Sequence, residues 1–144
     1  AVAVDSSGNN YIADSDNNRM QVFNSSRVYL RTIGTTREEG DDFDHFSGPN
    51  DLAVDSAGRI YVADTYNHRI QVLSNSGAYL TTIGGNWGSH SGEMREPVGV
   101  DVDAQGNVYV AENENRPLAP AGHAPDIFGQ VLRPSISRPA AQAH

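Results

Sequence analysis

The sequence predicts an all-β protein made of repeated four-stranded antiparallel units. The first observation is a series of short runs rich in aliphatic, β-branched and tyrosine residues, separated by turn-forming residues. The second is that the pattern recurs three times, with Asp5, Asp55 and Asp103 at equivalent positions about 50 and 48 residues apart. Periods of this length are typical of propeller blades and solenoid units.

The most regular unit spans residues 49–84. Its four strand-like runs are expected at residues 51–55, 59–64, 69–73 and 78–83. The gaps between them are too short for parallel crossovers, so the unit is a meander of antiparallel hairpins. Ile60 and Val62 point to one face and Tyr61 and Ala63 to the other. Both faces are apolar, and we therefore expect a covering layer on each.

The remainder of the chain divides around this unit. A first repeat covers residues 1–34, and an incomplete third repeat covers residues 97–116. An acidic linker, 35–48, and a glycine-rich linker, 85–96, connect the repeats, and a Pro/Ala-rich tail occupies 117–144. In the first repeat we expect strands at 1–5, 10–14, 19–23 and 28–33, and in the third at 99–103 and 107–112. We expect the tail to be mostly irregular, although residues 127–132 weakly resemble a third strand.

Composition excludes several classes of function. The net charge is −8 and the chain has no lysine, which makes nucleic-acid binding unlikely. It has no cysteine, so disulfides, thiolate nucleophiles and cysteine zinc sites are absent. No apolar run is long enough to insert into a membrane. Ala1 falls inside an expected strand, so we interpret the chain as a fragment of a longer protein, and its compartment stays open.

The two linkers contain the unusual polar and aromatic residues. Five carboxylates in 35–48 raise the alternative of a calcium site, but their spacing does not match a dedicated calcium loop, so we expect a solvated acidic loop. They are Glu38, Glu39, Asp41, Asp42 and Asp44. Trp87 in the second linker is either a recognition anchor or, as we favour, a packing residue between blades.

The run from Gly58 to Val72, preceded by Pro49 and containing Asn67-His68-Arg69, resembles an NHL repeat. Counterparts are Asn17-Asn18-Arg19 in the first repeat and Asn115-Arg116 in the third. The resemblance covers about residues 1–116. It implies a partial NHL-type β-propeller, from a family fold of six blades. Each repeat then supplies about one blade, whose first strand lines a central channel.

Polar residues that recur in every repeat are expected to be structural. The carboxylate that ends the second strand can pair with the arginine that begins the third, and Asn67 between them can adopt a left-handed turn conformation. The pairs are Asp14 with Arg19, Asp64 with Arg69, and Glu112 with Arg116. Asp5, Asp55 and Asp103 open Asp-x-x-Gly turns.

Resemblance to NHL domains implies a non-enzymatic scaffold that binds protein partners. One alternative is part of a metal-dependent propeller lyase or lactonase, with zinc or calcium at the channel mouth. Another is a half-propeller that forms a homodimer, because a chain with so few blades leaves apolar faces uncovered. We assign no catalytic residue and no cofactor. The candidate binding residues are His45, Asp51, Trp87 and His90.

Overall fold

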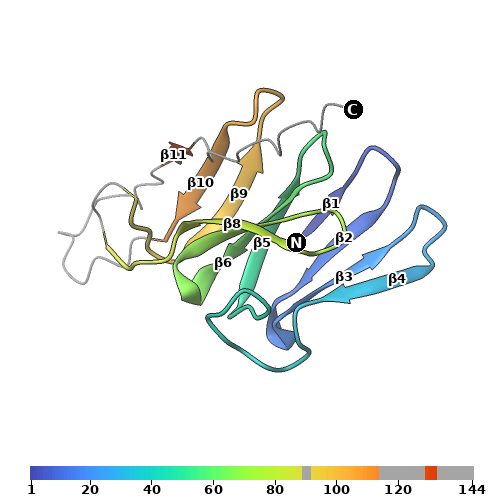
Figure 1. The fold of residues 1–144 in the computed structure, drawn as a ribbon, viewed down its shortest axis with the longest axis horizontal. Helices are drawn as coiled ribbons and strands as arrows, with labels where there is room; N and C mark the ends of the chain where they lie inside the picture. The colour runs from blue at the N-terminus through green and yellow to red at the C-terminus, as the bar shows by residue number, and fades with distance from the viewer. Residues whose placement is uncertain (89–91, 114–128, 133–144) are drawn as a thin grey trace, which may run out of the picture.

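The computed structural model describes residues 1–88, 92–113 and 129–132, and these residues form three antiparallel β-sheets. Figure 1 shows the sheets side by side, fanned like the blades of a propeller. Strand β5 (Pro49–Val54) contacts both β1 (Val2–Val4) and β9 (Pro97–Val102), so the first strands of the three blades are neighbours. The predicted all-β architecture of repeated sheets is confirmed.

Blades 1 and 2 are four-stranded meanders in which consecutive strands pair. Blade 1 contains β1, β2 (Asn10–Asp14), β3 (Arg19–Phe23) and β4 (Tyr29–Ile33). Blade 2 contains β5, β6 (Ile60–Asp64), β7 (Arg69–Leu73) and β8 (Tyr79–Gly84). A single 3-10 turn joins the second strand to the third: η1 (Ser15–Asn17) or η2 (Thr65–Asn67). Within the described ranges, no helix is long and apolar enough to cross a membrane.

Blade 3 consists of β9, β10 (Val108–Glu112) and β11 (Gly129–Leu132), with β10 in the centre. Val108 pairs with Leu132, just as Ile60 pairs with Leu73 in blade 2. The first pair is 24 positions apart and the second 13, so the chain between the paired positions is 11 residues longer in blade 3. Within the tail, which we expected to be mostly irregular, residues 129–132 form a strand inside the segment 127–132 that weakly resembles a third strand. Residues 129–132 are the displaced third strand.

An aspartate fixes the turn between the first and second strands of each blade. In blade 2, Oδ1 of Asp55 accepts two backbone N–H groups at 2.9 Å, and Oδ2 accepts the hydroxyl of Tyr61 at 3.1 Å. Gly58 closes the turn with φ 81°, a conformation that favours glycine. Burial, followed by the nearby Asp55 charge, raises the pKa of Tyr61 to about 12. The equivalent aspartates are Asp5 and Asp103.

Blade 2 is covered on both faces, as its sequence predicted. One core lies between blades 1 and 2 and contains Ile60 and Val62. A second core lies between blades 2 and 3 and contains Tyr61 and Ala63. All four side chains are fully buried. The two blade interfaces are therefore built by the alternating residues of a single strand, β6.

Candidate functional site

A buried ion pair joins the second and third strands of blade 2. Nε of Arg69 lies 2.7 Å from Oδ2 of Asp64, and the two side chains are only 6% and 0% exposed. The remaining guanidinium nitrogens donate to the backbone carbonyls of Asp41, Asp42 and His45 at 2.7 to 3.1 Å. The linker 35–48 therefore folds over Arg69 and is fixed to the blade.

The five carboxylates of this linker are exposed, as expected for a solvated acidic loop, whereas the end of the linker packs against the blade. This end is buried, since Phe46 is 1% exposed and the N–H of Ser47 donates to Oδ1 of Asp64 at 2.7 Å. The run of exposed residues at 41–44 does face solvent. Complete burial raises the pKa of Asp64, while hydrogen bonds from Asn67 and Ser47 and the nearby Arg69 oppose that shift.

Blade 1 repeats the ion pair in a more exposed form. Arg19 Nε lies 2.8 Å from Asp14 Oδ2, with side chains 22% and 27% exposed. The left-handed residue of these turns is Asn18 (φ 52°) in blade 1 and His68 (φ 53°) in blade 2. The prediction that Asn67 takes this conformation is wrong. Asn67 ends the 3-10 turn, and its side-chain amide instead donates to Asp64 at 2.9 Å.

A groove with a volume of about 470 Å³ opens where the turns after the second strands meet the linkers between blades. All three blades and both linkers contribute to it. The lining residues are Ser15, Asp16, Asn18, Glu39, Gly48, Asn50, Thr65, Tyr66, Glu96, Val98 and Asn113. Three of these are carboxylates, and among the described lining residues there is no arginine or histidine.

The groove is lined by equivalent positions whose side chains differ between repeats. Scaffold positions keep their residue type, as the Asp–Arg pairs show, whereas three pairs of equivalent groove positions do not. The differing equivalents are Asp16 and Tyr66, Gly48 and Glu96, and Asn50 and Val98. A site with a specific ligand is expected where a repeat is broken, because the scaffold itself needs only the repeated residues.

Tyr66 and Glu96 define the character of the groove. The ring of Tyr66 rests on the backbone of Gly48, where an added Cβ would lie 2.6 Å from the ring carbons, and Tyr66 is 65% exposed. Glu96 occupies the position of Gly48 in the next repeat and adopts φ 40°. A left-handed conformation costs a non-glycine residue about 1 to 2 kcal/mol. Glu96 therefore bears a conformational cost that the preceding repeat avoids by having glycine at this position.

Hydrogen bonds tie the groove to the scaffold between blades. The hydroxyl of Ser15 donates to the Pro49 carbonyl at 2.5 Å, and the hydroxyl of its equivalent Thr65 donates to the Pro97 carbonyl at 2.7 Å. The amide of Asn50 donates to the Val98 carbonyl at 3.0 Å. These bonds link each blade to the next at the rim of the groove, so its shape depends on how the blades are packed together.

Two candidate residues predicted from sequence serve the scaffold. Nδ1 of His45 lies 2.7 Å from Asp42 within the linker, and this contact raises the pKa of His45. Asp51 on β5 accepts the N–H of Val100 at 2.9 Å and so joins blade 2 to blade 3. Neither residue is among those that line the groove.

Trp87 lies elsewhere on the surface. It is 63% exposed, and the guanidinium of Arg95 lies 4.7 Å from its ring centroid. The favoured expectation that it packs between blades is therefore wrong, and Met94, which is 1% exposed, is buried in the core between blades 2 and 3. His90 lies outside the described residues, as does Arg116 of the predicted Glu112–Arg116 pair.

Metal ligands do not converge within the described ranges. No group of three or more histidine, aspartate or glutamate side chains in these ranges is placed to hold a metal ion. The exposed carboxylates of the acidic linker make local contacts instead, such as those of Asp42 with the backbone of Asp44 and with His45.

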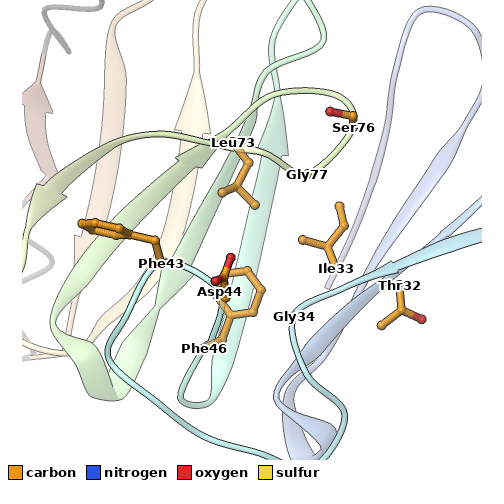
Figure 2. Close-up of a pocket in the computed structure, with 9 residues that line it drawn as sticks. All are labelled: Thr32, Ile33, Gly34, Phe43, Asp44, Phe46, Leu73, Ser76 and Gly77. Atoms are coloured by element: carbon orange, nitrogen blue, oxygen red, sulfur yellow. The ribbon is translucent and has the colours of Figure 1, made fainter.

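A second cavity, of about 150 Å³, lies between blades 1 and 2 near their outer strands. Figure 2 shows Ile33, Phe46 and Leu73 around it, with Asp44 from the linker. This volume is below the range of about 300 to 1,000 Å³ that is usual for ligand pockets. We interpret the cavity as a packing gap that the linker covers.

The repeated four-stranded sheets define the chain as a β-propeller-type protein. Residues 46–73 match the family model of the NHL repeat. The NHL-repeat resemblance predicted from the sequence is thus confirmed for this segment of blade 2. No curated protein sequence matches it.

Solved structures share the fold at low sequence identity. A protein of unknown function from Bacteroides thetaiotaomicron has a TM-score of 0.63 and 18% identity over 73% of this chain and 30% of its own. Virginiamycin B lyase from Staphylococcus aureus has a TM-score of 0.56 and 14% identity over 78% of this chain and 33% of its own. A luciferin-regenerating enzyme has a TM-score of 0.53 and 14% identity over 90% of this chain and 41% of its own. The chain thus spans about a third of the length of these structures, and the likeness shows the fold alone.

Proposed function

We propose that the chain is a non-enzymatic binding module whose groove receives an arginine or lysine side chain of a partner protein. The observation that supports this most directly is the composition of the groove. Three carboxylates, several amide groups and one exposed tyrosine surround a volume of about 470 Å³, and none of the described lining residues is basic.

Electrostatics favour a cationic ligand. Asp16, Glu39 and Glu96 share one concave surface, and the net charge of −8 attracts cations toward the whole protein. Two of the carboxylates are already oriented: Glu39 accepts the hydroxyl of Ser47 at 3.2 Å, and Glu96 accepts the amide of Asn113 at 3.3 Å. Pre-oriented acceptors reduce the entropy that a ligand loses on binding.

Tyr66 adds an aromatic surface to the acidic one. Its ring lies against Gly48, and the largely exposed side chain lines the groove. A guanidinium or ammonium over an aromatic ring gains about 0.5 to 1 kcal/mol at an exposed site. Carboxylates beside an aromatic ring thus suit the flat guanidinium of arginine best.

Binding of a labelled hexa-arginine peptide, followed by fluorescence anisotropy, tests the proposal. Asp16→Asn, Glu39→Gln and Glu96→Gln should each weaken binding about three- to tenfold, corresponding to about 0.7 to 1.4 kcal/mol for a partly desolvated charge pair. Asp101→Asn is the matched control, because Asp101 is exposed and outside the groove. Equal weakening by the control would refute the proposal. Stoichiometric zinc or calcium in the purified protein would instead support the metal-dependent enzyme.

We further propose that a second copy of the chain covers the outer face of blade 1. Val2, Val4 and Ile12 on this face are 64%, 58% and 38% exposed. Their equivalents in blades 2 and 3 lie in the cores between blades. These equivalents are Leu52, Val54 and Val62, and Val100, Val102 and Val110. In a closed pair of chains, the third blade of the partner would provide this cover.

Solution mass measured by light scattering tests the dimer. We expect a two-chain species that Ile12→Asp converts to monomer without loss of β-sheet circular dichroism. Thr36→Asp is a control substitution at an exposed position in the linker 35–48. A monomeric wild-type chain at micromolar concentration would refute this second proposal.

A further inference from the structure

The linkers are anchored to the preceding blade by equivalent hydrogen bonds that differ in chemistry. The N–H of Gly48 donates to Oδ1 of Asn18 at 2.9 Å. One repeat later, the N–H of Glu96 donates to Nδ1 of His68 at 3.1 Å. Asn18 and His68 both take the left-handed position that follows the 3-10 turn. The chain therefore makes the same contact once with an amide and once with an imidazole.

The two acceptors respond differently to pH. An amide oxygen accepts a hydrogen bond at any pH near neutrality, whereas Nδ1 of histidine accepts only in the neutral ring with its proton on Nε2. Protonation turns both ring nitrogens into donors. Imidazoles titrate between about pH 5 and 8. The anchor of Glu96 therefore exists in only one of the two protonation states of His68.

We propose that His68 makes the groove pH-sensitive by holding Glu96 in its ligand-binding position only while the imidazole is neutral. This inference rests on the proposed function for its effect on ligand binding, but the hydrogen bond itself can be tested separately. The backbone of Glu96 is left-handed at φ 40°, so it depends on its anchors. Blade 3 supplies the others: Asn113 donates its N–H to the Glu96 carbonyl at 3.1 Å and its amide to the carboxylate.

Loss of the His68 bond acts on the groove in two ways. The N–H of Glu96 would face another donor, and the strained backbone could relax, which would move one of the three carboxylates. Protonated His68 would also place a positive charge beside the groove. Both effects lower the affinity for a cationic ligand as the pH falls.

Other charged groups lie around His68 and Glu96, and they are present whether the His68 ring is neutral or protonated. On the linker they are Glu96 itself and Arg95, whose N–H donates to Glu112 of β10 at 2.9 Å. On β7, Arg69 follows His68 directly and is paired with Asp64. Across the groove lie Asp16 and Glu39. Because these groups are present in both wild type and His68→Asn, comparison of the two separates their effect from that of the imidazole.

Amide NMR from pH 8 to 5.5 tests the switch without any ligand. We expect the Glu96 amide resonance to shift and its hydrogen exchange to accelerate, in step with titration of the His68 ring. The Gly48 amide, bonded to Asn18, is the internal control and should not follow this transition. His68→Asn copies blade 1 and should keep the Glu96 amide protected throughout. A Glu96 amide that does not respond, or that responds equally in His68→Asn, would overturn the inference.

Binding of the hexa-arginine peptide separates this inference from the proposed function. If the groove binds, wild-type affinity should fall at least threefold between pH 7.5 and 5.5, and the affinity of His68→Asn should stay within twofold. His45→Asn controls for the other described histidine, which lies in the linker 35–48. A pH-dependent Glu96 amide without peptide binding would refute the proposed function and leave the switch intact. Binding with equal pH dependence in wild type and His68→Asn would refute the regulatory role.

Discussion

Replacement of Arg69 by methionine should be far more damaging than the same replacement of Arg19. Arg69 and Asp64 are almost completely buried, and Arg69 also binds three carbonyls of the linker. Removing one partner of a buried pair costs about 3 to 5 kcal/mol, because the other charge is left uncompensated. The Arg19–Asp14 pair is partly exposed, and pairs of that kind contribute about 0 to 1 kcal/mol.

Urea denaturation followed by circular dichroism at the β-sheet band measures both values. The difference between Arg69→Met and Arg19→Met should be at least about 2 kcal/mol, or more than tenfold in the folding equilibrium. Asp64→Asn in the Arg69→Met background should recover part of the loss, since it removes the unpaired carboxylate and keeps the acceptor for the N–H of Ser47. Equal losses for the two arginines, or no recovery in the double variant, would refute the reasoning.

Two other contacts and one strained backbone position lead to further predictions. Asp42 raises the pKa of His45 from the ordinary 6.5, so this contact stabilises the fold at pH values below 6.5 and is lost as the pH rises through the folded-state pKa. His45→Gln should therefore show a flatter dependence of urea midpoint on pH between 6 and 8, and a slope unchanged from wild type would contradict this. Thr65→Val removes the buried bond to the Pro97 carbonyl and should cost about 1 to 3 kcal/mol in unfolding free energy, with Thr65→Ser as the conservative control. Glu96→Gly should raise the unfolding free energy by up to about 1 kcal/mol while weakening peptide binding, because it relieves the left-handed strain and removes a carboxylate; a lower melting temperature would contradict the strain.

The strands could be predicted from sequence because their turns are local. The described strands of the first two blades and the first two of the third lie within two residues of the expected boundaries. Each Asp-x-x-Gly turn carries its own hydrogen bonds, so the signal is complete within a few residues. The third strand of blade 3 was indicated only by the weak resemblance of residues 127–132, because a fixed period places this strand 11 residues earlier.

The candidate site depends on contacts between blades, which the sequence of one repeat does not contain. The charges of the acidic linker predict its exposed carboxylates, but they do not predict that its backbone carbonyls accept hydrogen bonds from the guanidinium of Arg69. The clearest sequence signal for the groove is a difference between equivalent positions of the repeats. Glu96 stands immediately before Pro97 where the previous repeat has Gly48 before Pro49, and an exchange of glycine for glutamate at a turn marks a position with a separate role.

The longer connection between β10 and β11 suggests where new binding specificity could be introduced into this scaffold. Eleven added residues between β10 and β11 leave the pairing of these strands in the register of blade 2. The closure entropy of a flexible loop grows only slowly with its length, so a blade can accept such an insertion at small cost. In blades 1 and 2, the turn between the second and third strands lines the groove through Asp16 and Tyr66. Engineered loops inserted there would be displayed beside the groove while the ladders of the sheets stay unchanged.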